Sequence, residues 1–418
     1  MICRFLLDPE RLSHILFIWE EMGKVGLFVV SGIFVITENA PHQHKRGVMG
    51  TMNIVKPTLL LNTDRAMSNI KRMADKAKHS GVRFRPHFKT HQSAVIGEWF
   101  RAHGVNAITV SSVSMAEYFA NQGWQDITIA FPVNVREIDV MNTLAERITL
   151  HLLVESEISV RFLNRHLSQQ VHGWIKVDTG YHRTGLSWEK PEEIAALARI
   201  ILQSDSINLH GLLTHAGQTY SARSSARVQE LYQESVTRLK AVQQYIQRQE
   251  NVPIELSVGD TPGCRVVERF SEVDEVRPGN FIFYDVMQLT TGACHEEELA
   301  LAVACPVVAK HEKRHEIVIY GGAIHLSKES LRVPGQEQPV YGYVALPEDK
   351  GWGPSIPETY VAGLSQEHGM IRANKSFFER IQVGDIVIVL PVHSCLTANL
   401  LRKYRTFDGK VIELADLT

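Results

Sequence analysis

The sequence predicts an α/β fold, namely a (β/α)8 TIM barrel followed by a mostly β C-terminal domain. From Pro57 onward, short β-branched runs alternate with amphipathic helical stretches. About eight such strand–helix units fall within roughly 230 residues, which favours a barrel over a six-stranded open sheet. After about Leu289, short strand candidates are separated by Gly, Pro and polar turns, with little helix between them.

The elements follow in order along the chain. The predicted barrel strands cover residues 82–84, 107–110, 127–130, 149–154, 173–177, 209–214, 254–258 and 273–276. Nearly all are apolar, as expected of strands that are covered on both faces. An additional strand at 59–61 precedes them, and the predicted helices cover residues 64–79, 92–103, 114–122, 135–145, 158–167, 191–202 and 223–250. The second domain has predicted strands at 299–308, 316–320, 341–344, 360–363, 370–373 and 386–390.

The first fifty residues differ in character from the rest. The apolar run at 25–36 is too short to span a bilayer as a helix. It could be the core of a signal peptide, but Glu20 and Glu21 precede it and residues 38–41 make a poor cleavage site. A start codon assigned too far upstream would also explain this segment. We expect an N-terminal extension outside the fold at 1–51, a barrel domain at 52–290 and a β domain at 291–418.

Composition excludes several classes of protein. The 418 residues are 44% hydrophobic and 22% charged, as in an ordinary soluble globular protein. The net charge of −2 and the absence of a basic run argue against nucleic acid as a partner, and we expect no membrane association. The five cysteines are scattered without a CxxC pair, which suits a reducing compartment, so we expect a cytoplasmic protein.

Lys89 stands out in the stretch from Arg85 to His91. It follows the first barrel strand and lies between two histidines, just ahead of a helical pattern. The C-terminal ends of barrel strands are where catalytic groups collect. The ordinary alternative is a solvated surface lysine.

Other polar clusters follow later barrel strands. Arg183, framed by two glycines, follows the fifth strand, and its loop suits approach to an anionic or phenolate oxygen. The turn after the seventh strand opens a probable helix, so its backbone N–H groups could receive a phosphate. The remaining candidates after strands six to eight are His215, Tyr220, Gly259, Asp260, Thr261, Arg277, Gly279 and Asn280. An amine, two arginines and two phosphate-receiving turns together suit pyridoxal phosphate, with the lysine forming the Schiff base.

Six ordered motifs span more than 300 residues of the chain. They are RPHFKTH at 85–91, DTGYHRTG at 178–185, GDTPG at 259–263, EVRPGNFIFYD at 275–285, EHG at 367–369 and PVHSC at 391–395. With these motifs, the chain from about residue 53 to its end resembles the fold-type III pyridoxal phosphate enzymes. The resemblance is to the branch of D-serine dehydratase and D-threonine aldolase, with an alanine racemase-like barrel.

The resemblance implies roles for individual residues. Lys89 would carry the cofactor as a Schiff base, with His87 beside it, and Arg183 would face the phenolic oxygen. The backbones around Gly259–Thr261 and Gly279–Asn280 would hold the phosphate. Either Arg277 or Tyr220 would face the pyridine nitrogen. Asp260 places an acid in a presumed phosphate turn, so its side chain must point away or the phosphate contact is weaker. A homodimer is also implied.

His393 and Cys395 form a candidate metal pair. On an extended chain, two residues at this spacing point the same way, so imidazole and thiolate could bind one ion, typically Zn²⁺. Without further evidence, a His-x-Cys spacing is more often a coincidence than a metal site. In the family, dehydratases resemble this chain in having His-x-Cys with zinc, whereas aldolases tend to have His-x-Asp with a harder ion such as Mn²⁺.

The pair therefore favours a zinc- and pyridoxal phosphate-dependent dehydratase. It would convert D-serine, or a related D-3-hydroxy amino acid such as D-threo-3-hydroxyaspartate, to a 2-keto acid and ammonia. A metal-dependent D-threonine aldolase is the alternative, and a cofactor-binding homeostasis protein is the non-enzyme alternative. A racemase would need a second base on the opposite cofactor face, and the sequence offers no convincing one.

Overall fold

The computed structural model describes residues 4–6, 16–21, 24–29, 52–333 and 338–417. The chain divides into two compact units, Met1–Met52 and Asn53–Thr418. In the first unit, β1 (Arg4–Leu6), β2 (Leu16–Glu21) and β3 (Lys24–Val29) form an antiparallel sheet in that order. Residues 30–36 of the apolar run and the polar stretch 42–50 lie outside the described residues.

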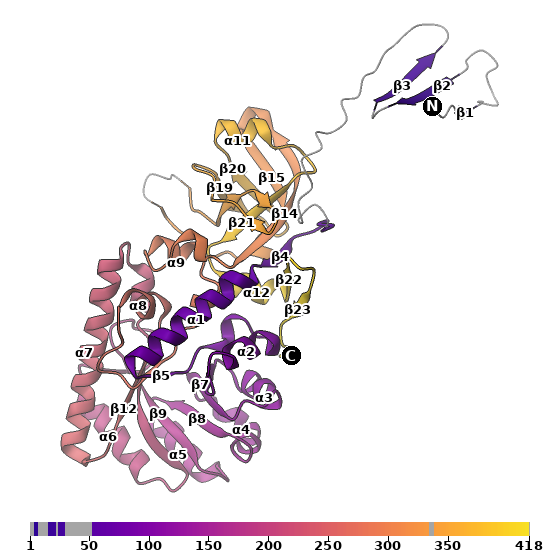
Figure 1. Cartoon of the computed structure of the whole chain (residues 1–418). Helices are drawn as coiled ribbons and strands as arrows, with labels where there is room; N and C mark the ends of the chain where they lie inside the picture. Colours follow the sequence, from indigo (N-terminus) through magenta and orange to yellow (C-terminus); the bar gives the residue numbers. More distant parts are fainter. Residues whose placement is uncertain (1–3, 7–15, 22–23, 30–51, 334–337, 418) are drawn as a thin grey trace. The chain divides into compact units, whose positions relative to one another are not determined.

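Within the described residues, eight parallel strands form the barrel of the second unit (Figure 1). They are β5 (Arg83–Phe84), β6 (Ile108–Val110), β7 (Asp126–Pro132), β8 (Thr149–Val154), β9 (Val171–Asp178), β11 (Ile207–Thr214), β12 (Glu255–Val258) and β13 (Glu275–Val276). Their order is β5-β13-β12-β11-β9-β8-β7-β6, and a parallel bridge between His87 and Thr109 joins the two ends. A short strand, β10 (Leu186–Ser187), pairs with β9.

Helices follow the strands around the barrel. They are α1 (Thr63–Ser80), α2 (Ala94–Arg101), α3 (Val113–Asn121), α4 (Ile138–Ala145), α5 (Glu157–His166), α6 (Pro191–Leu202), α7 (Ser225–Glu250) and α8 (Thr261–Val266). The first of them, α1, shows how sequence sets the bounds. The Asn62 side chain accepts a 3.0 Å hydrogen bond from the Arg65 N–H at its start, and Gly81 ends it with φ of 72°. Its apolar residues at helical spacing, Ile70, Met73 and Ala77, are buried.

A second sheet builds the C-terminal domain. Its long strand β14 (Leu301–His311) pairs with β15 (Glu316–Tyr320) and β21 (Ile386–Pro391). With β16 (Gly342–Ala345), β19 (Tyr360–Leu364) and β20 (His368–Arg372), these strands close an antiparallel ring in the order β15-β20-β19-β16-β21-β14. The small strands β17 (Pro347–Glu348) and β18 (Gly351–Trp352) pair with each other.

The strand that precedes the barrel belongs to this second sheet. The three buried leucines of β4 (Thr58–Leu61) bring it antiparallel against β14. On its other side, β4 pairs in parallel with β22 (Lys403–Thr406), which in turn pairs with β23 (Val411–Glu413). The two ends of the second unit therefore meet in one sheet (Figure 1).

The predicted barrel and mostly β domain are confirmed. Residues 286–401 also contain short helices that the sequence patterns did not indicate, namely α9 (Val286–Thr290), α10 (Ala323–Leu326), α11 (Lys375–Arg380) and α12 (Ser394–Leu401). Among the described residues, no helix is long and apolar enough to cross a membrane.

Candidate active site

A cavity of about 740 Å³ lies where the barrel strands end, and residues of the C-terminal domain also line it. Every candidate site residue that the sequence indicated lines this cavity, namely His87, Lys89, Arg183, His215, Tyr220, Gly259, Asp260, Thr261, Arg277, Gly279, Asn280, His393 and Cys395. The structure thus gathers side chains that are more than 300 positions apart in the sequence.

Lys89 projects into the cavity from the loop after β5. The loop makes one turn of 3-10 helix, η2 (Phe88–Thr90), in which Nδ1 of His87 accepts a 3.4 Å hydrogen bond from the Lys89 backbone N–H. Phe88 and Thr90 are buried on either side, while the Lys89 side chain is exposed to the cavity. The amine is therefore accessible through the cavity although protein surrounds it.

Burial, together with two nearby arginines, favours a neutral amine at Lys89. Burial lowers the pKa of Lys89, Cys395 raises it, and the positive charges of Arg183 and Arg277 lower it again, so that the net direction is downward. A lysine in this state is neutral near neutral pH more often than a solvated one. This is the form that attacks a carbonyl or accepts a proton.

The C-terminal segment holds the Lys89 loop in place. The Tyr404 hydroxyl donates a 2.9 Å hydrogen bond to the carbonyl of His91. The backbone N–H of Ala415 donates at 2.6 Å to the carbonyl of Gln92, which has a positive φ of 48°. The last strands of the chain therefore position a loop that lies more than 300 residues earlier.

His215 lies at the end of β11 with one defined tautomer. Its Nδ1 contacts the carbonyl of Gly259, which can only accept, so Nδ1 carries the proton and Nε2 keeps a lone pair. Burial and the charges of Lys89 and Arg183 lower the pKa of His215 well below its usual value, so the ring is neutral.

Tyr181 packs edge-on to this ring, with 5.9 Å between centroids. Gly217 makes room for Tyr181, because a Cβ at residue 217 would lie 2.3 Å from the tyrosine ring. The guanidinium carbon of Arg183 lies 5.1 Å from the centroid of the same tyrosine ring. Tyr181 therefore connects the loop of Arg183 to the His215 side of the cavity.

Arg277 is buried and fixed by three acceptors. Its Nε donates to the Ser257 hydroxyl at 2.6 Å, and its Nη2 donates to the carbonyl of Thr214 at 2.6 Å and that of Ser257 at 3.3 Å. Burial lowers the pKa of Arg277 to about 10, so the guanidinium remains charged at neutral pH. It presents a fixed positive charge at the cavity floor.

The acid in the turn after β12 is bound to the start of the helix that follows. Asp260 caps α8, since its Oδ2 accepts hydrogen bonds from the Gly263 N–H at 2.6 Å and the Thr219 hydroxyl at 2.9 Å. The Thr261 hydroxyl is buried on the same turn without a partner. The Tyr220 hydroxyl accepts the Thr261 N–H at 3.3 Å and can donate its own hydrogen onward. This set of donors fits an anionic group such as a phosphate.

Gly279 packs tightly against the Lys89 loop. A Cβ there would lie 2.9 Å from Oγ1 of Thr90 and 3.0 Å from both Cβ and the carbonyl oxygen of His87. Only glycine allows this turn, the second anion-binding candidate, to approach the lysine so closely.

The sequence predicted that His393 and Cys395 lie on an extended chain, and this prediction was wrong. His393 is the N-cap of α12 and Cys395 is in its first turn. The chain turns here because Asp285 accepts the Ser394 N–H at 3.0 Å, which caps an otherwise unpaired donor of the helix. The pair nevertheless faces the cavity.

The donor atoms of this pair fit a soft metal ion. Nδ1 of His393 is buried without a hydrogen-bond partner. Burial alone would raise the pKa of the Cys395 thiol, but hydrogen bonding and charge from His393 lower it below its usual value. A thiolate beside an imidazole suits Zn²⁺. Sγ of Cys395 also lies 3.5 Å from Nδ2 of Asn280.

Lys176 is a cavity residue that the sequence analysis did not single out. It is 4% exposed on β9, and burial with the charges of Arg277 and Arg183 lowers its pKa to about 7. The signal was present, since a lysine interrupts the apolar run of a predicted inner strand.

Comparison with known proteins identifies the family to which this chain belongs. Residues 61–286 match the family described as alanine racemase, N-terminal domain, and residues 300–407 match a putative serine dehydratase domain. The first match covers more than half of the chain. The chain therefore belongs to the alanine racemase N-terminal domain family, of the fold-type III pyridoxal phosphate enzymes.

Individual relatives refine this class. A D-threo-3-hydroxyaspartate dehydratase from Delftia sp. is 28% identical over 367 residues, covering 85% of this chain and 95% of the relative. Its structure superposes with a TM-score of 0.80, covering 89% of this chain and 99% of that one. A D-serine dehydratase from Dictyostelium discoideum is 25% identical over 397 residues, covering 85% and 94%.

Aldolases are more distant, since a 3-hydroxy-D-aspartate aldolase from Paracoccus denitrificans is 23% identical over 292 residues, covering 66% of this chain and 73% of the relative. The curated relatives are thus lyases, and the fold and the relatives together define this chain as a pyridoxal phosphate-dependent lyase.

Proposed function

We propose that this protein is a zinc- and pyridoxal phosphate-dependent dehydratase that converts D-serine, or a related D-3-hydroxy amino acid such as D-threo-3-hydroxyaspartate, to a 2-keto acid and ammonia. The observation that carries the proposal is that one cavity holds Lys89 together with His393 and Cys395. The similar solved structures also support it, since one of them is a metal-free form of a cysteine-to-alanine variant of a D-threo-3-hydroxyaspartate dehydratase.

The residues divide into those that would hold the cofactor and those that would act on the substrate. Lys89 would bind the aldehyde carbon, and the turns at Thr261 and Gly279 would receive the phosphate. Arg277 lies deeper, fixed by Ser257 and Thr214, where it can face the pyridine nitrogen. Arg183 and the neutral His215 remain for the phenolic side of the ring. Bound there, pyridoxal phosphate supplies an electron sink for charge that develops at Cα.

Lys89 is the proposed base. Its lowered pKa makes the neutral amine available to accept the Cα proton. His393 and Cys395 would hold a zinc ion, whose Lewis acidity assists departure of the β-hydroxyl. Cys395 lies 3.4 Å from Thr90, the residue next to Lys89, so proton acceptor and leaving-group site lie on neighbouring parts of the cavity wall.

The alternatives differ in which bond breaks. A D-threonine aldolase would use the same metal position to help deprotonate the hydroxyl and cleave Cα–Cβ. A cofactor-binding homeostasis protein would bind pyridoxal phosphate without turnover, and the metal pair in the cavity has no purpose in that case. The His393/Cys395 combination favours the dehydratase over both.

The test is a substrate panel with metal analysis of the same sample. Purified protein with pyridoxal phosphate and zinc is expected to release pyruvate and ammonia from D-serine, or the corresponding keto acid from D-threo-3-hydroxyaspartate. Release of glycine and acetaldehyde from D-threonine would favour the aldolase instead. A yellow protein that turns over none of these compounds would favour the homeostasis protein, and racemisation of D-alanine would also contradict the dehydratase.

We also propose a homodimer, a cytoplasmic location and the division into an N-terminal extension, a barrel domain over 52–290 and a metal-bearing domain over 291–418. The dimer is supported by family resemblance, and the location by scattered cysteines, of which the four within the described residues are free. Size-exclusion chromatography with light scattering tests the dimer.

A further inference from the structure

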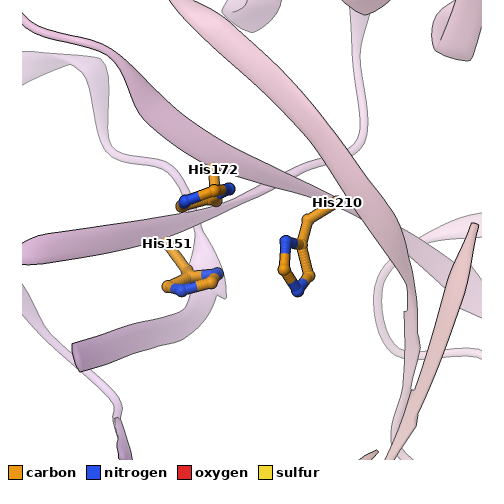
Figure 2. Close-up of side chains that lie close together, drawn as sticks. All are labelled: His151, His172 and His210. Carbon is orange, nitrogen blue, oxygen red and sulfur yellow. The ribbon is translucent and has the colours of Figure 1, made fainter. Parts of the chain in front are cut away.

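Three histidines gather at the opposite end of the barrel from the cavity (Figure 2). His151 and His172 lie near the N-terminal ends of β8 and β9, and His210 lies in the first half of β11; the three strands are neighbours in the barrel. One ring nitrogen from each lies within 4.8 Å of those from the other two. Figure 2 shows the rings of His151 and His172 lying close together, with the His210 ring facing both.

A layer of apolar side chains separates this cluster from the cavity. Leu153, Trp174 and Leu213 form a buried core cluster on the same three strands. On β9, alternate residues place His172 on one side of Trp174 and the cavity residue Lys176 on the other. The histidines are therefore distinct from the His393/Cys395 site.

Carboxylates adjoin two of the rings from outside the cluster. Nε2 of His151 lies 3.1 Å from Oδ1 of Asp126, and Nε2 of His210 lies 3.2 Å from Oε2 of Glu255. Neither contact has hydrogen-bond geometry, and both nitrogens are buried without a hydrogen-bond partner. A small rotation of each ring would let Nε2–H donate to its carboxylate and leave Nδ1 as the unprotonated nitrogen that faces an ion. Metal-binding histidines are commonly oriented in this way.

The Nδ1 of His151 already acts as an acceptor. It receives a 3.2 Å hydrogen bond from the indole N–H of Trp174, so Nδ1 carries no proton, and its lone pair would coordinate an ion in exchange for this hydrogen bond. Burial, the largest effect, lowers the pKa of all three histidines, that of His151 to about 4, which keeps the rings neutral as metal ligands must be.

An ion could enter from solvent. His151 is 2% exposed, whereas His172 and His210 are only partly buried. A cavity of about 380 Å³ at this end of the barrel is lined by His172 together with Gln170 and Asn208. The net charge around the cluster also permits a cation. Three carboxylates lie there, those of Asp126, Glu255 and Glu275. They pair with only two arginines, Arg83 and Arg85.

We propose that His151, His172 and His210 form a second metal site that binds a divalent transition ion, Zn²⁺ being the reference case, and ties three barrel strands together. Imidazole is the ligand that zinc, copper and nickel favour. Tetrahedral Zn–N bonds of about 2.0–2.1 Å need ligand nitrogens about 3.3 Å apart, so the rings must move closer than their present spacing of up to 4.8 Å. The rings of His151 and His172, now stacked at 22°, must also turn so that their lone pairs converge on the ion. The site lies at the barrel end where residues serve stability more than catalysis.

The test is a Co²⁺ titration of the metal-stripped, tag-free, full-length protein in the Cys395→Ala background. This background removes the thiolate, and with it any sulfur-to-cobalt charge-transfer absorption. One equivalent of Co²⁺ is expected to bind with the ligand-field absorption of nitrogen coordination. Adding His172→Ala should abolish that equivalent, whereas adding His166→Ala, which removes an exposed histidine at the end of α5, should leave it unchanged.

Two further measurements keep the outcome decisive. His172→Gln nearly preserves side-chain volume, so loss of the cobalt equivalent in this variant with an unchanged circular dichroism spectrum excludes unfolding as the cause. Zn²⁺ should raise the Tm of the Cys395→Ala protein but not that of the protein that also carries His172→Gln. Absence of cobalt binding in the Cys395→Ala protein, or its survival in both His172 variants, overturns the proposal. Neither result bears on dehydratase activity, which is measured with the native Cys395.

Discussion

Sγ of Cys395 lies 3.4 Å from Oγ1 of Thr90, across 305 positions of sequence. Thr90 is covalently next to Lys89, so a single hydroxyl connects the proposed metal-binding thiol to the loop of the proposed base. The C-terminal domain thus supplies part of the wall of the cavity that holds Lys89. The two residues should therefore be tested jointly.

Replacing Lys89 and Cys395 should separate cofactor binding from turnover. Lys89→Ala removes the amine that we propose binds the aldehyde, so the visible absorbance of lysine-bound cofactor should disappear along with activity. Cys395→Ala keeps the amine, so the absorbance should remain while kcat on D-serine or D-threo-3-hydroxyaspartate falls by roughly 10²-fold or more, as for loss of a catalytic electrostatic group. Absorbance spectra and keto-acid assays check both variants. Full activity in Cys395→Ala would contradict the metal role.

Removing the metal should reproduce the Cys395→Ala result in the native protein. A chelator is expected to abolish turnover without bleaching the lysine-bound cofactor, and added Zn²⁺ should restore the rate. Keto-acid release before and after chelation, with spectra of the same samples, measures this. Persistent activity in a sample shown to be metal-free would refute a role for the ion in the reaction.

Gly279→Ala should weaken cofactor binding. The new Cβ would lie within 3.0 Å of both Thr90 and His87, so the Lys89 loop or the anion-binding turn must shift. The Kd for pyridoxal phosphate, measured by absorbance titration, is expected to rise by at least about tenfold. Gly351→Ala is the matched control, because its Cβ would come no closer than 3.5 Å to any atom, here Nδ2 of Asn62. An equal effect in both variants would mean that the close packing at Gly279 is unimportant.

Asp260 should make stability depend on pH. Burial raises the pKa of its carboxyl from 3.8 to about 6, although hydrogen bonds from Gly263 and Thr219 lower it. Because the folded pKa is the higher one, this group's stabilisation is fully present below about pH 4. It is lost as pH rises through about 6, by up to about 3 kcal/mol. Urea denaturation of the wild type and Asp260→Asn from pH 4 to 7 should show this slope only in the wild type. Parallel curves would contradict it.

Arg85 should be a major contributor to barrel stability. It is fully buried, with Nε 2.6 Å from Oε2 of Glu275 and its guanidinium also on Asp126. Arg85→Met removes the fully buried cation that Glu275 and Asp126 share and leaves the buried Glu275 with only the partly exposed Arg83, so the free energy of unfolding should fall by about 3–5 kcal/mol. Arg161→Met, at an exposed i,i+4 pair with Glu157, should change it by less than about 1 kcal/mol. Chemical denaturation distinguishes the two cases.

Much of the fold was predictable because its elements are locally encoded. The helix at 191–202 and the strand at 149–154 have the bounds that their patterns predicted, since proline starts the first and apolar residues fill the second. The cavity lining was also within reach of the sequence, because residues that follow parallel strands must meet at one end of the barrel.

The parts that sequence did not reveal depend on long-range contacts. The turn at Ser394 needs a carboxylate from Asp285, 109 positions earlier, so the helical setting of Cys395 could not be read locally. The histidines of β8, β9 and β11 look like isolated polar residues in apolar strands. Their clustering depends on strand order and register, including the pairing of His151 with His172.

The placement of β4 has a consequence for synthesis. Its leucines pair with β14 and β22, which the ribosome makes roughly 240 to 340 residues later. Until then, the three leucines of β4 have no partner strands, although the barrel that follows is already being synthesised. The nascent chain therefore exposes an unpaired strand edge that can pair with other chains. This edge is covered only when the last strands leave the ribosome.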